Sequence, residues 1–301
     1  MAVGKDRSAS PPTERAIAVV ELVVERGAPM TAAEVADELG LSRSTVAAVL
    51  SALDERGWVR RLADLSYRPG SRLAGLAATA RDSLAVPAGV EEVLRALSQR
   101  VGCGAALSLV TRTELTFLAV TEGNGRLPAG ITTGTSLPLR APAGAAVVAF
   151  ADEQWQSAWL ATAAAEQRPA LAQVLEQIRA TGTGLWGIGA ADPVVLDVLA
   201  DVVEQLAGDA VPQHLRGRVL SLLARISGRP YGFADLRADE PLPLSYAVAP
   251  VFDGTGRATW ELQVGPLREA VGLAEREHCA GELRHAAEKL NMSQKNQPSG
   301  H

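Results

Sequence analysis

The sequence has little of what secreted, metal-bound or membrane proteins require. Only two cysteines, Cys103 and Cys279, occur among 301 residues, and neither has CxxC spacing or a nearby histidine cluster. This argues against a disulfide scaffold and against structural zinc, and it fits a reducing compartment. No run of about 18 uninterrupted apolar residues is present, and the polar N-terminus lacks the apolar core of a signal peptide. We therefore expect a soluble cytoplasmic protein without membrane association.

Apolar residues make up 47% of the chain, which is ample for packed cores, and a length of 301 residues predicts two domains. The net charge of −5 is unusual for a DNA-binding protein, but the distribution of charge matters more than its sum. Between residues 40 and 74, six arginines oppose three acidic residues, so the local net charge is +3. A small positive surface on an acidic body is typical of a DNA-reading face.

Residues 31–53 have the spacing of two short helices joined by a tight turn. Thr31 and Glu34 match a capping box, so a helix is expected to begin at about Thr31, and Gly40 supplies the permissive backbone of the turn. Ser42 suits the N-cap of the second helix. A stripe of apolar residues with i, i+3, i+4, i+7 spacing follows it: Val46, Val49, Leu50 and Leu53. This pattern predicts a helix-turn-helix, with a helical hairpin in a larger bundle as the alternative.

The flanking segments favour the helix-turn-helix. An amphipathic helix is predicted over residues 13–26, and a β-hairpin is predicted over residues 58–70. The expected apolar face of the helix is Ala16, Val19, Val20, Val23 and Val24. Three helices followed by a hairpin with three arginines predict a winged helix-turn-helix, whose wing lies on the sugar-phosphate backbone. A helical bundle has no use for such a ribbon.

The remainder of the chain predicts an α+β domain with a mostly antiparallel sheet flanked by helices. A helix is expected at 90–101, strands at 105–111, 115–121 and 131–133, and helices at 144–150, 152–164 and 170–180. Two strands are expected at 246–252 and 258–264, and a final helix at 267–290. The long segment 182–243 between these halves predicts two helices, at 194–206 and 214–227.

These patterns divide the chain into five parts. We expect a disordered tail (1–12), a winged helix-turn-helix domain (13–70), a linker helix (71–87), an α+β domain with the 182–243 insertion (88–290) and a second disordered tail (291–301).

The chain resembles the IclR family of bacterial transcriptional regulators. Three stretches carry the resemblance: residues 14–16 with 31–53, 57–61 and 67–68; residues 137–139 with 144–150; and residues 249–256 with Gly265 and Pro266. The resemblance covers about residues 13–190 and 244–290. It implies a GAF-like effector domain after the winged domain, and implies that small-molecule effectors bind there.

The departures from the family pattern are informative. Ala47 and Ala48 stand where the family commonly has a His-Arg pair in the recognition helix. These two positions therefore offer no side-chain hydrogen bonds to base edges, although alanine can contact a thymine methyl group. Tyr246 stands where the family often has cysteine, and Gln263 where it often has serine. The effector-binding residues implied by the resemblance are Leu137, Arg140, Tyr246 and Gln263. For Tyr246 and Gln263, the reading as ordinary strand residues remains open.

Enzyme signals are weak. The GxGxxG at 182–187 follows a predicted helix, whereas a dinucleotide fingerprint must follow a strand. His278 and His285 lie seven residues apart on one helix among glutamates, which favours a solvated charged face over a metal site. Cys279 has no identifiable base. We therefore expect no catalytic residue, no metal and no cofactor.

The sequence thus predicts a sequence-specific transcriptional regulator controlled by a small-molecule effector. The alternative is a ligand-sensing or protein-interaction module with a degenerate DNA-binding face, and a degenerate enzyme has no residue constellation behind it. A homodimer or homotetramer on double-stranded operator DNA is expected. The predicted DNA-binding residues are Ser42, Arg43, Ser44, Thr45, Ala47, Ala48, Ser51, Arg60, Arg61 and Arg68. The sequence specifies neither the effector, the operator, nor the direction of control.

Overall fold

The computed structural model describes residues 10–84, 86–123, 131–187, 229–265 and 268–295. The chain divides into two compact units, Met1–Val86 and Pro87–His301, each of which is described separately. The helices expected at 194–206 and 214–227 lie outside the described residues. Among the residues that are described, no helix is long and apolar enough to cross a membrane.

The first unit has three helices and a small antiparallel sheet, followed by a further helix. The helices are α1 (Pro11–Glu25), α2 (Ala32–Leu39), α3 (Arg43–Glu55) and α4 (Ser71–Ser83). Strands β2 (Val59–Arg61) and β3 (Ser66–Pro69) form the predicted hairpin. A two-residue strand, β1 (Met30–Thr31), extends this hairpin to a three-stranded sheet of order β1-β3-β2, which the sequence did not predict. The winged helix-turn-helix fold is therefore confirmed.

Local capping fixes the helix-turn-helix. The Thr31 side chain accepts a hydrogen bond from the Glu34 N–H at 3.3 Å, and the Glu34 carboxylate accepts one from the Thr31 N–H at 2.7 Å. Gly40 ends α2 with φ +61°, a left-handed conformation that glycine adopts without a Cβ penalty. Val46 and Leu50 of α3 are fully buried, as predicted. The caps and the buried stripe fix the orientation of α3 relative to α2.

One face of α1 differs from the prediction. Leu22 is buried with Val19 and Val23, whereas Val24, which was expected on the apolar face, is 45% exposed. The helix carries apolar residues around most of its circumference, including the exposed Ile17, so periodicity alone did not define its buried stripe.

The second unit is built on a seven-stranded antiparallel sheet of order β6-β5-β4-β11-β10-β7-β8. The strands are β4 (Gly104–Val110), β5 (Glu114–Thr121), β6 (Ser136–Pro138), β7 (Gly184–Gly187), β8 (Arg229–Pro230), β10 (Tyr246–Phe252) and β11 (Ala258–Gly265). A separate pair joins β9 (Leu242–Leu244) to β12 (Arg268–Val271). The α+β prediction is confirmed.

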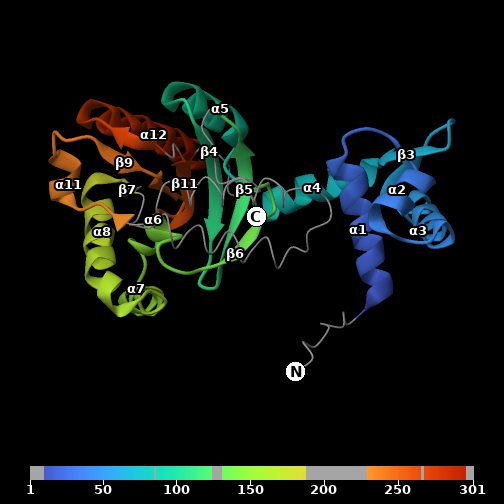
Figure 1. The fold of residues 1–301 in the computed structure, drawn as a ribbon, viewed down its shortest axis with the longest axis horizontal. Helices are drawn as coiled ribbons and strands as arrows, with labels where there is room; N and C mark the ends of the chain where they lie inside the picture. Colours follow the sequence, from blue (N-terminus) through green and yellow to red (C-terminus); the bar gives the residue numbers. More distant parts are fainter. Residues whose placement is uncertain (1–9, 85, 124–130, 188–228, 266–267, 296–301) are drawn as a thin grey trace. The chain divides into compact units, whose positions relative to one another are not determined.

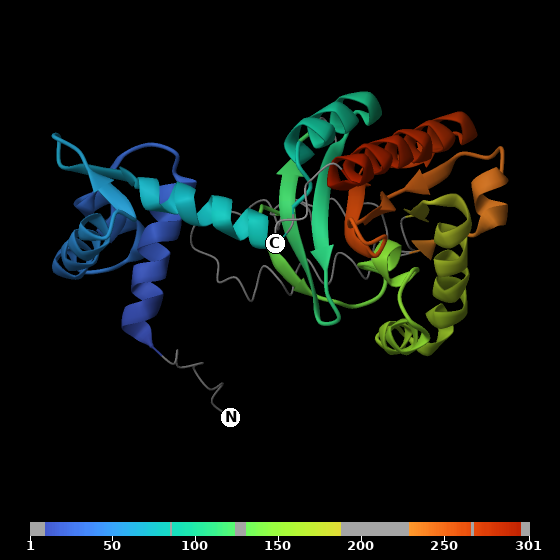
Figure 2. The ribbon, with the colours of Figure 1, turned by 180° about the vertical axis from the view of Figure 1, so that it is seen from behind.

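Helices cover both faces of this sheet. On one face, α5 (Val90–Val101) contacts β4 and β5, and α12 (Leu273–Lys295) contacts β10 and β11; the two helices lie side by side (Figures 1 and 2). On the other face, α6 (Ala145–Val148) contacts β10 and β11, and α8 (Arg168–Thr181) contacts β7. Helix α7 (Glu153–Ala161) packs on α6 and α8, and the short α11 (Phe233–Arg237) packs on α12. The central strands are therefore buried on both faces.

Three predictions for this unit were wrong. The strand expected at 131–133 is a turn through Gly134, and the edge strand is β6, which pairs Leu137 with Leu115. The final helix begins at Leu273 rather than 267, because residues 268–271 pair with β9. The tail expected to be disordered from Asn291 continues α12 to Lys295, and the Asn291 side-chain oxygen accepts the Phe252 N–H at 2.8 Å.

Candidate DNA-binding surface and effector site

The exposed side of α3 is a stripe of small residues. Ser44, Ala47, Ala48 and Ser51 have i, i+3, i+4, i+7 spacing and are all exposed, opposite the buried Val46 and Leu50. A stripe without long side chains lets the helix backbone approach a groove closely. At its start, the exposed Arg43 is the one long cationic side chain.

Two of the predicted DNA-contact residues, Ser42 and Thr45, form hydrogen bonds that stabilise the start of α3. The Ser42 hydroxyl caps α3 by accepting the Thr45 N–H at 3.2 Å, and it also hydrogen-bonds the Thr45 hydroxyl at 2.8 Å. Thr45 is half-buried. The Ser44 side chain is exposed, but its hydroxyl also hydrogen-bonds the Ser42 hydroxyl at 3.0 Å. Arg43 and Ser51 are therefore the polar side chains most available to base edges, and Ser44 can add only the remaining hydrogen-bonding capacity of its hydroxyl.

The wing places two arginines directly opposite each other. Arg60 on β2 pairs in register with Arg68 on β3, and both side chains are exposed. Like charges in this position repel, so the pair is favourable only when an anion lies against it. Arg61 pairs in register with the buried Tyr67, on the other face of the hairpin. The backbone N–H of Arg61 donates to the Asp54 carboxylate of α3 at 3.1 Å.

The arginines of this surface are electrostatically available. Within the described part of the chain, Arg43, Arg60 and Arg68 form no ion pair, whereas Arg26 of the same unit pairs with Glu38 at 3.1 Å. Unpaired, exposed guanidinium groups are the groups that phosphates attract most readily. The structure therefore concentrates uncompensated positive charge on the hairpin and at the start of α3.

The four implied effector residues are not brought together. Tyr246 on β10 and Gln263 on β11 are both half-buried and diagonal neighbours on the sheet face that α6 and α8 cover. Leu137 shares that face but lies on the edge strand β6, three strands from β11. Arg140 follows β6 and is exposed. Tyr246 is occupied by stacking on Trp186, with ring centroids 4.8 Å apart.

A buried carboxylate lies at the centre of the same face. Glu261 on β11 is 2% exposed, and its carboxylate oxygens accept the N–H groups of Gly144 at 3.3 Å and Ala146 at 2.9 Å. Burial raises its pKa to about 7, although both backbone hydrogen bonds act to lower it. The Ser108 hydroxyl lies on the adjacent strand in register with Glu261. A carboxyl that titrates near neutral pH beside a free hydroxyl is typical of a functional site.

Other polar atoms around this face are also unsatisfied. Among the described residues, the Ser108 hydroxyl, both side-chain polar atoms of Gln177 on α8 and the Trp186 indole nitrogen are buried without a hydrogen-bond partner. Such groups in one layer indicate a place where a water or a ligand completes the hydrogen bonding. Glu261 was not predicted from the sequence. Polar and apolar residues alternate along β11, which is typical of a strand with one solvated face. In the structure, α6 covers that face.

Metal and thiol chemistry find no support in the residues that are described. They contain no group of three or more His, Cys, Asp or Glu side chains that could hold a metal ion. Cys103 and Cys279 are buried thiols, and burial raises their pKa values to about 11 and about 12.

The fold and this surface define a winged helix-turn-helix protein with a separate α+β unit. Residues 12–63 match the family model described as the IclR helix-turn-helix domain. Among curated proteins, no sequence matches the chain.

Several solved structures have a similar fold over nearly the whole chain. The Thermotoga maritima IclR is 16% identical, covers 94% of this chain and 98% of its own, and has a TM-score of 0.57. Pseudomonas aeruginosa HmgR is 21% identical (94% and 97% covered, TM-score 0.51). An IclR homolog from Microbacterium hydrocarbonoxydans, complexed with 4-hydroxybenzoate, is 17% identical (95% and 100% covered, TM-score 0.51). The chain therefore carries an IclR helix-turn-helix domain, and as a whole it has the fold of IclR regulators.

Proposed function

We propose that this protein is a transcriptional regulator that binds operator DNA through its winged domain and is controlled by a small molecule bound in its second unit. The observation that carries the proposal is the small-residue stripe of α3 next to uncompensated arginines, within a domain that matches the IclR helix-turn-helix.

In this mechanism the two basic elements have different tasks. Arg60 and Arg68 contact phosphates from the wing, which positions the domain but carries no sequence information. Arg43, Ser44 and Ser51 contact base edges in the major groove, and Ala47 and Ala48 pack on thymine methyl groups. Most of the specificity is therefore expected from the beginning of α3, with the wing supplying affinity.

Electrophoretic mobility shift on the DNA upstream of the protein's own coding region tests this division. Arg60→Ala and Arg68→Ala should weaken binding to all sequences alike and each reduce the salt slope of log K by about 0.9. Arg43→Ala should lower the ratio of operator to random-DNA affinity by roughly tenfold. Arg95→Ala, an exposed arginine of α5, is the matched control and should change neither quantity. Unchanged operator affinity in Arg43→Ala would exclude the assigned role of α3.

The effector is proposed to bind on the sheet face that α6 and α8 cover, around Glu261 and Ser108. A homodimer would present two recognition helices to half-sites about one helical turn, or a multiple of it, apart, so a ligand that favours one protomer arrangement by a few kcal/mol would switch DNA binding. Sedimentation velocity tests the assembly: a monomer at the protein concentration that saturates DNA contradicts it.

The relative crystallised with 4-hydroxybenzoate supplies a first effector probe. We expect a candidate effector to change operator affinity in the wild type and to lose that effect in Glu261→Gln and Ser108→Ala. If both variants respond as the wild type does, the effector does not bind around these residues.

The second candidate is a sensing or interaction module whose DNA-binding face has lost specificity, and Ala47 with Ala48 is the observation that favours it. The same mobility-shift assay decides between the two. A saturable, salt-sensitive complex at nanomolar protein supports the regulator, and only weak, sequence-independent binding supports the module.

A further inference from the structure

A cavity lies on the opposite face of the sheet from Glu261. It has a volume of about 340 Å³ and is formed by β7, α11, α12 and the end of α8. Its β7 residue, Leu185, pairs with Ala247 and so faces the α12 side of the sheet, whereas its neighbour Trp186 faces the α8 side. The cavity is therefore separate from the proposed effector site.

Three arginines line this cavity. Arg276 and Arg284 lie eight residues apart on one face of α12, and Arg237 lies at the end of α11. Against them stands one acidic residue, Glu277, so the charged lining has a net charge of +2. This positive lining is unusual in a chain whose net charge is −5.

Arg276 is a buried cation at this cavity. It is 2% exposed, and its guanidinium donates to the carbonyls of Val271 at 2.6 Å, of Glu240 at 3.1 Å and of Ala238. Its Nε has no partner, and no carboxylate among the described residues pairs with it. Carbonyl dipoles hold the guanidinium in place but do not neutralise it, so its charge persists at the cavity.

The other two arginines are exposed and available. Arg284 makes one long hydrogen bond, to the Thr181 carbonyl at 3.4 Å, and neither Arg237 nor Arg284 has an ion-pair partner within the described ranges. Long, flexible guanidinium groups at a cavity rim can close on an anion with two parallel hydrogen bonds.

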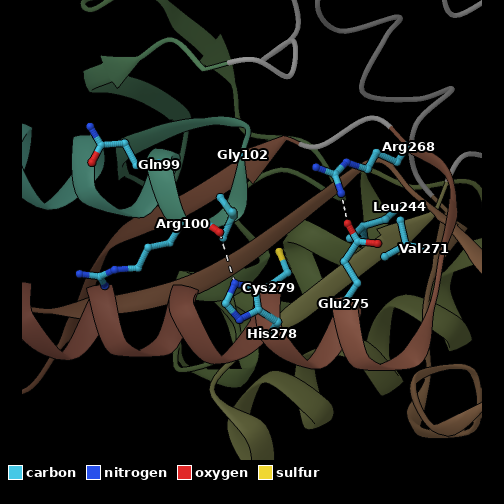
Figure 3. A pocket seen from close by; sticks show the side chains of 10 residues that line it. Gln99, Arg100, Gly102, Leu244, Arg268, Val271, Glu275, His278 and Cys279 are labelled. Atoms are coloured by element: carbon cyan, nitrogen blue, oxygen red, sulfur yellow. Dashed lines mark hydrogen bonds and ion pairs between the residues drawn. The ribbon is translucent and has the colours of Figure 1, made fainter.

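The neighbouring cavity of about 280 Å³ provides the contrast (Figure 3). There Arg268 forms an ion pair with Glu275, Arg100 pairs with Glu282 at 3.0 Å, and His278 hydrogen-bonds the Arg100 carbonyl. Its cationic groups are already compensated within the protein, so an incoming anion gains little.

Apart from Thr181 and Thr183, the uncharged lining of the larger cavity is apolar. Leu185, Leu236 and Phe233 contribute to it, and Phe233 is 44% exposed. A volume near the lower end of the roughly 300–1,000 Å³ range of small-molecule pockets fits a compact ligand. We propose that this cavity binds a small organic carboxylate, with its carboxylate on Arg237 and Arg284 and its apolar body on Leu185, Leu236 and Phe233. Inorganic phosphate has no apolar body to pack on these three side chains, so it should bind more weakly than the organic carboxylate.

The test is a titration of the full chain, ¹³C-labelled at leucine methyl groups, with cyclohexanecarboxylate. The methyl resonances of Leu185 and Leu236 should shift in a saturable way, and the neutral isostere cyclohexanecarboxamide should bind at least tenfold more weakly. Arg284→Gln and Arg237→Gln should each weaken carboxylate binding at least fivefold, because each removes a charged hydrogen-bond donor. The matched control Arg95→Gln should bind as the wild type does.

Three results would overturn the proposal. They are an absence of saturable shifts at Leu185 and Leu236, equal binding of the carboxamide, and equal binding of inorganic phosphate. Glu261→Gln, which alters the proposed effector site, should leave this titration unchanged. Shifts confined to Leu115 and Leu137 on the other sheet face would place the carboxylate there instead. Failure of this proposal is thereby distinguishable from failure of the effector site.

Discussion

Glu261 makes the stability of the second unit depend on pH in a direction opposite to that of most carboxylates. An ordinary glutamate has a pKa of 4.5, whereas burial on β11 raises the pKa of Glu261 to about 7. Between these values the folded protein keeps the proton and the unfolded chain has released it. The free energy of unfolding contributed by this group therefore falls as the pH rises from about 4.5 to about 7.

The size of the effect follows from the two pKa values. Each unit of pKa difference corresponds to about 1.36 kcal/mol, and between pH 5 and pH 8 the difference yields a loss of about 2.5 kcal/mol. Glu261→Gln cannot ionise, so this loss should be absent from the variant. Gln also replaces one carboxylate oxygen with an amide nitrogen, which cannot accept a backbone N–H, so a pH-independent cost of about 1 kcal/mol is expected.

Urea unfolding followed by tryptophan fluorescence measures both quantities. Four of the five tryptophans, Trp155, Trp159, Trp186 and Trp260, lie in the second unit, so the signal reports mainly on its unfolding. The wild type and Glu261→Gln should differ by a free energy that changes by about 2.5 kcal/mol between pH 5 and pH 8. All other titrating groups are common to both proteins and cancel in the difference. Parallel pH profiles would refute the assignment of a raised pKa to this carboxyl.

Three further outcomes are expected. Thr31→Ala should destabilise the winged domain by about 1 kcal/mol in thermal unfolding, because the α2 N-cap is lost; Thr31→Ser should restore most of that stability. Cys103 and Cys279 should resist alkylation by a thiol reagent at pH 8 in the native protein, because burial and raised pKa values leave little thiolate; rapid native labelling would contradict their burial. Gly187→Ala should lower the melting temperature of the second unit, because the new Cβ would collide with the Tyr231 hydroxyl; an unchanged melting temperature would show that Tyr231 can move.

The winged domain was predictable because its signals are local. The Thr31 capping box, the Gly40 turn and the Ser42 N-cap each act within four residues, and all three appear in the structure. Strand β1 was missed for the opposite reason. Two residues carry no periodicity, and Met30 and Thr31 become a strand only by pairing with β3.

In the second unit, the missed features depend on contacts between distant segments. The segment interpreted as an insertion from residue 182 contributes β7, β8 and β9, whose strands are four residues or shorter and pair only with remote partners. Residues 268–271 look helical in sequence but pair with β9 instead. The ends of α5 and α8 were closely predicted. Each helix ends at a glycine in a left-handed conformation, Gly102 or Gly182, and such a cap is a local signal.

In the candidate sites, too, features set by local signals were predictable and features set by distant contacts were not. The exposure of Arg43, Ser44 and Ser51 follows from one helix period, and the opposition of Arg60 and Arg68 follows from the hairpin register, so the sequence could place them on the surface. The central position of Glu261 could not be predicted in this way. In β11, Thr259, Glu261 and Gln263 alternate with Trp260, Leu262 and Val264, which is the pattern of a strand with a solvated face. The face is covered only because α6 packs on it, and α6 is held there partly by its own N–H groups donating to Glu261. The carboxylate and its cover thus depend on each other, so a ligand that bonds Glu261 would act directly on the position of α6.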